Sequence, residues 1–396
     1  MDPKLRNFSS GSRKVFVSIS RRDLLCRLGA SVAAGAALLP LKGRCLSEVL
    51  QPPPASQPVG PIRLDRNENL YGPSEKAVAA MREGVSLANR YPGPECDDLA
   101  SSIAQLHRVA PEQVVLGCGS SEILRLAAVT LLGPGRKLVM ASPSWNLMAD
   151  YARRMGAEVL AVPLTKEFAH DLTAMLAGMD DLTGLVYICN PNDPTGTLTR
   201  QEDLLPFIHR TPWTTYIIVD EAYHHYAVAS SRDVSVMEHL VGNDRVIVTR
   251  TFSGIYGLAG LRVGYGIASP RTAALLAAAR LPFGVNVVAA RAAAAALGDA
   301  EHVRFSAQRN TNDRQEFLNQ VNARMLRAID SHANFVMLNT GRRAEEVVEH
   351  FRKNNIILPY PFPPMDKYVR VSLGTREDML EFWRVWDLLP LHEVAM

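Results

Sequence analysis

Cysteine is scarce in this chain of 396 residues, and its pattern excludes two kinds of stabilising site. Three of the five cysteines lie beyond residue 50, at Cys96, Cys118 and Cys189. None of the three has the spacing of a metal-ligand motif, so the sequence predicts no metal site. An odd number of thiols cannot pair completely, which excludes a full disulfide framework. We therefore expect these cysteines to be buried free thiols.

A strong excess of either charge is also missing. The formal net charge is +3, yet residues 1–50 hold nine Lys and Arg against three Asp and Glu. The rest of the chain therefore has a net charge of −3. That charge gives no electrostatic reason to expect nucleic acid or an anionic membrane as partner. Apolar residues make up 47% and charged residues 21%, which is ordinary for a globular protein, and the length suffices for two domains.

No apolar run is long enough to act as a stable membrane anchor. The run from Leu28 to Leu41 is too short to span a bilayer. It follows Ser20-Arg21-Arg22-Asp23-Leu24-Leu25, which resembles the twin-arginine export pattern. We therefore expect residues 1–50 to be a signal that directs export to the periplasm or another extracytoplasmic space. The alternative is a basic tail before a short buried helix. The Pro-rich residues 51–61 predict a linker.

Short apolar runs alternate with helical segments from about residue 95 onward. The expected strands are Val114–Leu116, Lys137–Met140, Val159–Val162, Leu185–Cys189, Tyr216–Val219 and Arg245–Thr249. The expected helices include Ser121–Leu132, Leu147–Met155, Gln201–His209 and Arg271–Ala279. This alternation predicts a large α/β domain over residues 95–300, with a mostly parallel sheet covered on both faces. In such sheets, ligands bind at the carboxyl ends of the strands.

A smaller α+β domain is expected over residues 301–396. It would begin with a long interdomain helix, roughly Glu301 to Ala328. The expected later pieces are Phe335–Leu338, Ala344–Asn354, Ile356–Leu358, Tyr368–Leu373 and Glu377–Leu388. Residues 62–94 are expected to form an N-terminal arm that joins this domain.

Three motifs with chemical potential directly follow expected strands. Asp220 ends the run Tyr216–Val219, where a carboxylate could cap a helix or pair with a cationic ligand atom. The segment Asn190-Pro191-Asn192-Asp193-Pro194-Thr195-Gly196 forms at least a rigid turn. The segment Gly117-Cys118-Gly119-Ser120-Ser121-Glu122 leads into a helix, whose N-terminal N–H groups can bind an anion. It lacks the third glycine of a dinucleotide motif, so a dehydrogenase is poorly supported.

A longer segment, Thr251 to Gly266, reads Thr-Phe-Ser-Gly-Ile-Tyr-Gly-Leu-Ala-Gly-Leu-Arg-Val-Gly-Tyr-Gly. It resembles the active-site signature of class I/II pyridoxal-phosphate (PLP) aminotransferases. The three motifs above match in family order, as do segments around Asn69, Tyr91, Trp145 and Arg370. The resemblance covers roughly residues 62–378 and points to the histidinol-phosphate aminotransferase branch. It implies the fold-type I PLP-dependent transferase fold and a homodimer whose substrate is a small molecule, an amino acid or an amine.

The resemblance also implies a role for each matching residue. The cofactor phosphate would be bound by Ser120, Ser121, Ser253 and Arg262, and Tyr91 would reach the phosphate of the neighbouring subunit. Asp220 would pair with the ring nitrogen, and Trp145 would stack on the ring. Asp193 and Tyr223 would face the ring hydroxyl. At the substrate, Arg370 would clamp the α-carboxylate, and Asn69 and Tyr71 would lie on the arm that closes over it. The alternatives to these binding roles are purely structural: Arg262 could form an ion pair, and Trp145 could pack in the core.

Three positions depart from the family pattern. Gly254 stands where the family has the lysine that bonds the cofactor, and no lysine occurs between Lys166 and Lys353. Asp193 stands where the family has Asn. Pro359 stands where the branch tends to have Arg, so a substrate phosphate would bind less well. Without the lysine, we expect PLP or pyridoxamine phosphate to bind non-covalently, with Asp193 accepting a hydrogen bond from a neutral ring hydroxyl.

Two functional hypotheses follow from this pattern. The first is an exported enzyme of the aminotransferase family with slow or altered chemistry, in which Tyr223, Tyr256 or Asp193 moves the proton that the lysine amine would move. The second is a non-catalytic protein of the same fold that binds a cofactor–amine adduct or serves as a partner subunit. Decay of a site that no longer binds cofactor would also lead to the second hypothesis.

Overall fold

The computed structural model describes residues 60–228, 234–239 and 243–390, all within a unit that spans Pro54–Met396. The predicted export signal (residues 1–50) and residues 51–59 of the predicted linker lie outside the described residues. Among the residues that are described, no helix is both long and apolar enough to cross a membrane.

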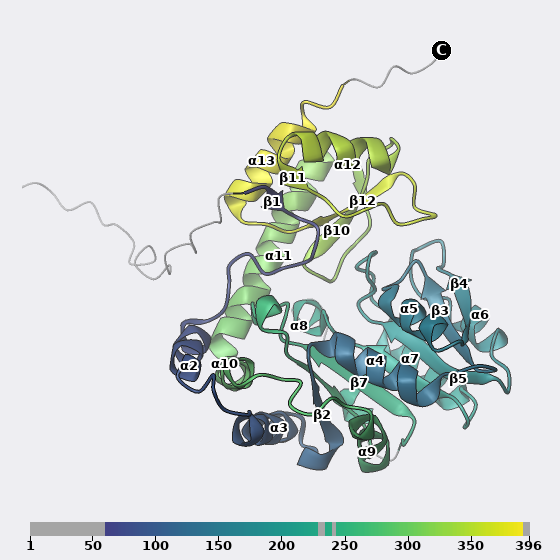
Figure 1. Cartoon of the computed structure of the whole chain (residues 1–396). Coiled ribbons are helices and arrows are strands. Elements are labelled where there is room, and N and C mark those ends of the chain that lie inside the picture. The colour runs from purple at the N-terminus through teal and green to yellow at the C-terminus, as the bar shows by residue number, and fades with distance from the viewer. Residues whose placement is uncertain (1–59, 229–233, 240–242, 391–396) are drawn as a thin grey trace, which may run out of the picture. The chain divides into compact units, whose positions relative to one another are not determined.

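A seven-stranded sheet forms the centre of the larger domain (Figure 1). Its strands lie in the order β2 (Val114–Gly117), β8 (Gly264–Ile267), β7 (Val246–Thr251), β6 (Tyr216–Asp220), β5 (Thr183–Cys189), β3 (Lys137–Ser142) and β4 (Glu158–Pro163). Only β8 runs antiparallel to its neighbours, so the predicted mostly parallel α/β sheet is confirmed. All six expected strands occur, with ends that differ by one or two residues.

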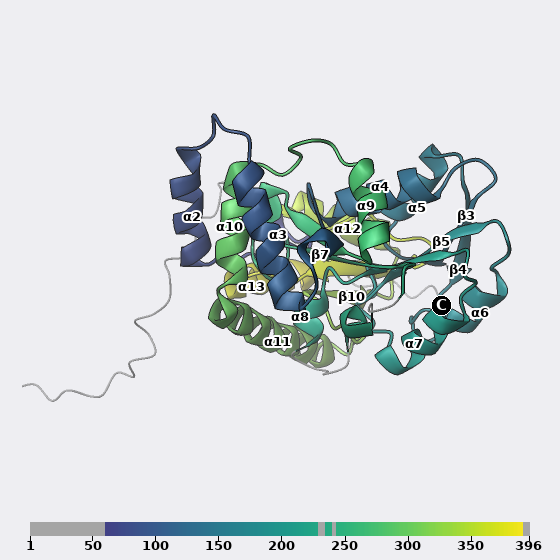
Figure 2. The ribbon, with the colours of Figure 1, turned by 90° about the horizontal axis from the view of Figure 1, so that it is seen from below.

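Helices cover both faces of this sheet, which is why its central strands are almost continuously apolar. One face carries α4 (Ser120–Leu131), α5 (Leu147–Arg154) and α9 (Pro270–Ala278). The opposite face carries α3 (Gly93–His107), α6 (Leu172–Ala177), α7 (Gln201–Arg210) and α10 (Val287–Leu297). Figure 2 shows α4, α5 and α9 on one side of the strands and α6 and α7 on the other. Every residue of β5 is buried, because both of its faces are covered.

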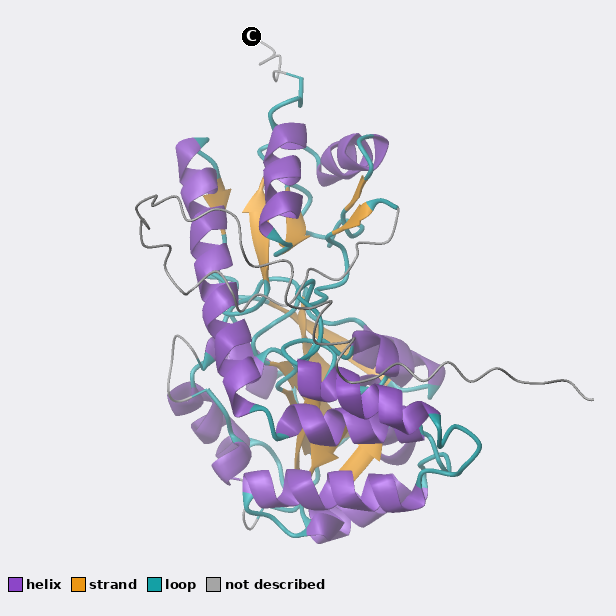
Figure 3. Ribbon diagram, turned by 90° about the vertical axis from the view of Figure 1, so that its left-hand side faces the viewer, coloured by secondary structure: helices purple, strands orange, loops and turns teal. Residues whose placement is uncertain are grey.

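The smaller domain has its own core. Helix α11 (Ala300–Ala323) leads from α10 to a three-stranded sheet with the order β12 (Tyr368–Ser372), β10 (Phe335–Asn339) and β9 (Arg327–Ala328). The helices α12 (Ala344–Lys353) and α13 (Arg376–Trp386) pack on it. Four aromatic side chains dominate this core: Phe317, Phe351, Phe382 and Trp383. Figure 3 shows the strands of the two domains as separate groups, each flanked by helices.

The N-terminal arm contacts both domains. Strand β1 (Ile62–Arg63) pairs in parallel with β11 (Ile356–Ile357) of the smaller domain. Helix α2 (Glu75–Val85) packs against α10 of the larger domain. At Gly84 a Cβ would lie 3.3 Å from the Cα of Val288, so the glycine permits the close approach of these two helices.

The structure corrects three expectations. The long helix ends at Ala323 rather than Ala328, and Arg327–Ala328 forms β9 instead. Strand β8 was not predicted, because two of its four residues are glycines and glycine has a low strand propensity. Its Gly264 is needed for packing, since a Cβ there would lie 2.3 Å from the backbone nitrogen of Ser120. Cys118 is exposed, whereas Cys189 is buried and Cys96 half-buried.

Candidate functional site

The candidate site lies at the carboxyl ends of β5, β6 and β7. In the sheet register Cys189 is paired with Asp220, and Asp220 with Thr249. The loop after β5 therefore carries Asp193 to the same edge of the sheet that Asp220 reaches at the end of β6. Parallel strands that end together place their following residues side by side, which is the general location of ligand sites in such sheets.

Asp220 is a buried carboxylate with two hydroxyl donors. The hydroxyl of Tyr187 donates to Oδ2 at 3.0 Å, and that of Thr249 donates to Oδ1 at 2.8 Å. Burial raises the pKa of Asp220 to about 6, although these two hydrogen bonds act to lower it. A carboxylate held this way would be stabilised by a cationic nitrogen placed beside it. Asp220 therefore has the chemistry to pair with a cationic nitrogen of a ligand.

Asp193 is the centre of a second buried network. Its Oδ1 accepts a hydrogen bond from Nη1 of Arg370 at 2.5 Å. Its Oδ2 accepts from the hydroxyl of Tyr223 at 2.8 Å and from Nδ2 of Asn67 at 3.1 Å. Nδ2 of Asn67 also donates to the hydroxyl of Tyr223 at 2.9 Å. Burial and the charge of Asp193 raise the pKa of Tyr223 well above its usual range, so this phenol is a neutral donor.

Arg370 joins the smaller domain to this network. It projects from β12, and its Nη2 donates to the backbone oxygen of Asp65 at 2.6 Å. Its guanidinium carbon lies 5.4 Å from the ring centre of Phe335 and 5.1 Å from that of Phe362. Its Nε is buried and has no hydrogen-bond partner. The predicted carboxylate clamp is therefore already paired with a carboxylate of the chain itself.

A candidate anion-binding cup lies where α4 begins. Gly119 precedes the helix with φ of +74°, and a Cβ there would lie 2.3 Å from Nη2 of Arg262. Arg262, itself in the left-handed region, donates from Nη1 to the hydroxyl of Ser253 at 3.3 Å. The first helical residues, Ser120 and Ser121, follow directly. A helix N-terminus, a guanidinium and a hydroxyl at one point fit a phosphate group.

Gly254 lies directly after Ser253 of this cup and presents no side chain. A Cβ at this position would lie 3.5 Å from Cε2 and 3.7 Å from the hydroxyl oxygen of Tyr226. These are ordinary van der Waals separations, so a larger residue could begin here without a clash. Tyr256, a predicted proton carrier, is buried, with its hydroxyl 3.2 Å from Nε2 of His225.

The other four predicted residues are either exposed or bonded to other parts of the chain. Trp145 follows β3 and is 40% exposed. Nδ2 of Asn69 donates to the backbone oxygen of Ile255, the neighbour of Gly254, at 3.2 Å. Tyr71 points instead to α11, where its hydroxyl donates to Asp313 at 3.0 Å. Tyr91 is 76% exposed.

The chain matches the family described as aminotransferase class I and II over residues 59–385. It belongs to that family. The histidinol-phosphate aminotransferase of Moorella thermoacetica is 38% identical over 324 residues, which cover 82% of this chain and 84% of that protein. The corresponding enzyme of Caldicellulosiruptor saccharolyticus is 36% identical over 322 residues, 81% of this chain and 89% of that protein.

Solved structures of the aminotransferase family share the fold. The histidinol-phosphate aminotransferase of Sinorhizobium meliloti, solved in complex with pyridoxal-5'-phosphate, has a TM-score of 0.77 and 27% identity. The alignment covers 83% of this chain and 89% of that one. A Thermus thermophilus aspartate aminotransferase mutant has a TM-score of 0.72 and 20% identity, with 87% and 100% covered, which shows the common fold. The predicted fold-type I architecture is confirmed.

Sequence reasoning missed two residues of this aminotransferase-family site. Tyr187, which holds Asp220, is a hydroxyl-bearing residue inside an otherwise apolar strand, and a buried phenol needs a partner. A tyrosine within an apolar strand is therefore a sequence signal that could have predicted a buried hydrogen-bond partner. Asn67 binds both Asp193 and Tyr223 from 126 and 156 residues away. No local pattern reports such a contact.

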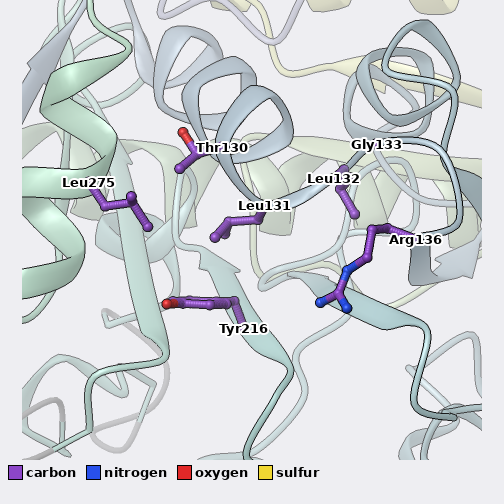
Figure 4. Close-up of a pocket in the computed structure, with 7 residues that line it drawn as sticks. All are labelled: Thr130, Leu131, Leu132, Gly133, Arg136, Tyr216 and Leu275. Atoms are coloured by element: carbon purple, nitrogen blue, oxygen red, sulfur yellow. The ribbon is translucent and has the colours of Figure 1, made fainter.

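A separate open depression of about 420 Å³ lies away from these residues (Figure 4). Arg136 and the leucine pair Leu131 and Leu132 contribute to its lining, together with Tyr216 at the start of β6. It is therefore at the amino end of that strand, whereas Asp220 is at the carboxyl end. None of the predicted site residues lines it. Within the described part of the chain, no cluster of His, Cys, Asp and Glu could hold a metal ion.

Proposed function

We propose that this chain binds PLP or pyridoxamine phosphate without a covalent bond and carries out slow or altered transamination-type chemistry on an amino acid or amine. The observation that carries this proposal is the presence, at one edge of one sheet, of a candidate anion cup and of a buried Asp220 that a cationic partner would stabilise. These are the two groups that a phosphorylated pyridine needs at its opposite ends. Membership of the aminotransferase family supports the same cofactor.

The chain's own residues would divide the work of binding. Ser253, Arg262 and the N-terminus of α4 hold the phosphate. Asp220 would pair with the protonated ring nitrogen, and a cofactor held in this way would supply an electron sink. Tyr223 donates a hydrogen bond at the edge of the ring, next to Asp193.

Gly254 determines what this site cannot do. It has no amine to bond the cofactor and none to move a proton to or from the substrate carbon. Removal of a positioned general base costs about 10²–10⁴ in rate, so we expect slow turnover. The competing candidate is a non-catalytic protein that keeps the binding residues, and Gly254 is the observation that favours it.

The decisive experiment mixes the purified chain with PLP. We expect the cofactor to remain bound through dialysis, yet to be lost on denaturation after borohydride treatment, because no lysine bonds it. Addition of an amino-acid and amine panel should then yield carbonyl product at a low rate. Bound cofactor without any product would favour the non-catalytic candidate. Absence of binding would refute the proposal.

A revertant tests whether the rest of the site is intact. The double variant Gly254→Lys with Asp193→Asn should hold PLP through borohydride and denaturation and should raise the turnover rate by about 10² or more. Gly254→Gln with Asp193→Asn is the matched control, since its side chain has a similar reach and no amine. A revertant that binds PLP but gains no activity over this control would contradict the proposed chemistry.

We further propose that the functional unit is a homodimer and that it is exported by the twin-arginine route. The exposed rings of Tyr91 and Phe283 are in contact, with their centres 4.5 Å apart and their planes tilted by 32°, and Leu281, two residues before Phe283 in the sequence, is also exposed. Apolar side chains gathered in this way usually lie in an interface. The arginine pair at Arg21 and Arg22 supports the export route.

A further inference from the structure

We propose that the hydroxyl of Tyr226 takes over the contact that a side chain at residue 254 would make, as a hydrogen-bond donor to the C4′ substituent of a bound vitamin B6 phosphate. C4′ is the carbon that carries the aldehyde of PLP and the amine of pyridoxamine phosphate. The inference rests on the proposed function and adds to it a residue that touches the reacting part of the cofactor. It starts from two observations, the position of Tyr226 beside Gly254 and its unpaired hydroxyl.

Tyr226 lies in α8 (His224–Ala227) and packs directly against the position that holds the lysine in the family. A Cβ at Gly254 would lie 3.5 Å from Cε2 and 3.7 Å from the hydroxyl oxygen of Tyr226. The next atom is the backbone oxygen of Ala222 at 3.9 Å, which can only accept a hydrogen bond. A bound cofactor would turn C4′ toward residue 254, because the family lysine bonds it there. The hydroxyl of Tyr226 is therefore the donor that the structure places beside this position.

The hydroxyl of Tyr226 has no hydrogen-bond partner in the described part of the chain, although only 2% of the residue is exposed. Buried tyrosines usually find a partner for this group, so an unpaired one needs an explanation. Burial raises the pKa of Tyr226 well above its usual range, which keeps the phenol neutral and able to donate. A ligand oxygen or amine nitrogen at C4′ would supply the acceptor.

Two other tyrosines near Gly254 in the sequence or the site are already committed to partners. The hydroxyl of Tyr223 donates to Oδ2 of Asp193 at 2.8 Å. The hydroxyl of Tyr256 lies 3.2 Å from Nε2 of His225. A new contact from either phenol would require the loss of an existing one, whereas Tyr226 loses nothing.

A purely structural role for Tyr226 would not need its hydroxyl. The residue belongs to the apolar core of the larger domain, where its neighbours include Phe252 and Ile255. Phenylalanine would fill the same space, and burial of a hydroxyl without a partner costs free energy. The hydroxyl is therefore a cost to the folded chain that a bound ligand would offset.

The test uses two ligands that differ by one oxygen atom at C4′, pyridoxine 5′-phosphate and 4-deoxypyridoxine 5′-phosphate. Neither can form an imine, so their affinities for the full chain, measured by calorimetry, report contacts without any turnover. We expect pyridoxine phosphate to bind at least about fivefold more tightly, which is the effect of one hydrogen bond. In Tyr226→Phe, the two affinities should agree within about twofold. Tyr360→Phe, at a tyrosine that is 88% exposed, is the matched control and should keep the preference.

The possible outcomes separate this inference from the proposed function. If both ligands bind the unmodified chain equally, or if Tyr226→Phe keeps the preference, the inference is wrong and the proposed function stands. If neither ligand nor pyridoxamine phosphate binds, both are refuted.

Urea denaturation without ligand tests the unpaired hydroxyl itself. Tyr226→Phe should unfold at the same or a higher urea concentration than the unmodified chain, because it removes a buried donor that has no partner. A lower concentration, or failure of the variant to fold, would show that the hydroxyl is bonded within the chain and would contradict the inference.

Discussion

The buried carboxylate of Asp220 lowers the stability of the folded chain when it is charged, and the same carboxylate is suited to a cationic ligand. Its pKa is about 6 in the folded chain and near 3.8 when unfolded. Folding therefore favours the protonated carboxyl, and the stability that this proton supports is present below pH 4 and lost as the pH rises through 6. A cationic ring nitrogen beside Asp220 would reverse this loss, because it would favour the charged carboxylate.

The variant Asp220→Asn should therefore remove a pH-dependent destabilisation. In the chain without added ligand, the free energy of unfolding of the variant relative to wild type should rise by up to about 3 kcal/mol between pH 4 and pH 6.5. Urea denaturation at several pH values measures this difference and cancels the contributions of other titrating groups. A difference that stays constant over this range would contradict the raised pKa.

Helix α4 and the turn before it form the cup as a unit. Gly119 holds φ of +74°, and Nη2 of Arg262 fills the space where a Cβ would be. The second constraint follows from the close approach of Arg262 to the start of α4. The glycine is therefore needed for the binding geometry as well as for the turn.

Gly119→Ala should displace Arg262 from the cup. We expect at least a tenfold loss in affinity for pyridoxamine phosphate, together with a stability loss of about 1–3 kcal/mol, because the φ of +74° and ψ of 166° at Gly119 belong to a backbone region that essentially only glycine adopts. Calorimetric titration measures the first and urea denaturation the second. Gly133→Ala is the control, since a Cβ there meets nothing within 4 Å. Equal affinities of the two variants would show that the cup does not bind the phosphate.

The elements of the fold were predictable to different degrees. Strands such as β5 were found from sequence because burial on both faces makes them continuously apolar. Strand β8 was missed because Gly264 and Gly266 meet the needs of neighbouring segments rather than those of a strand. The end of α11 was misplaced because β9 exists only through its pairing with β10.

The proposed homodimer can be tested at the exposed aromatic pair. Phe283→Glu should move the protein from dimer to monomer in size-exclusion chromatography with light scattering, because the charge cannot be buried against a second copy. Met325→Glu, at an apolar residue that is 93% exposed in the smaller domain, should leave the mass unchanged. A monomeric wild-type chain, or a dimer that tolerates Phe283→Glu, would contradict the proposal.

Export is tested in the intact cell. Replacement of Arg21 and Arg22 by Lys should retain the protein in the cytoplasm, because the twin-arginine route reads the arginine pair rather than its charge. Cell fractionation with an antibody to the chain measures the distribution. Replacement of Arg6 and Arg13 by Lys is the matched control. Unchanged export of the Arg21 and Arg22 variant would exclude this route.

The sequence by itself determined the α/β class and the set of motifs that end at one edge of the sheet, because both follow from local patterns of apolar runs and turn residues. It also identified Gly254 and Asp193 as departures from the family pattern, because the residues around each of them match that pattern. Only the tertiary structure decided that Asp193 is bonded to Arg370, 177 residues away, and that Tyr187 supports Asp220. The physical reason is that a buried charge must be paired with a group that the packing places next to it, and that group can lie at any distance along the sequence.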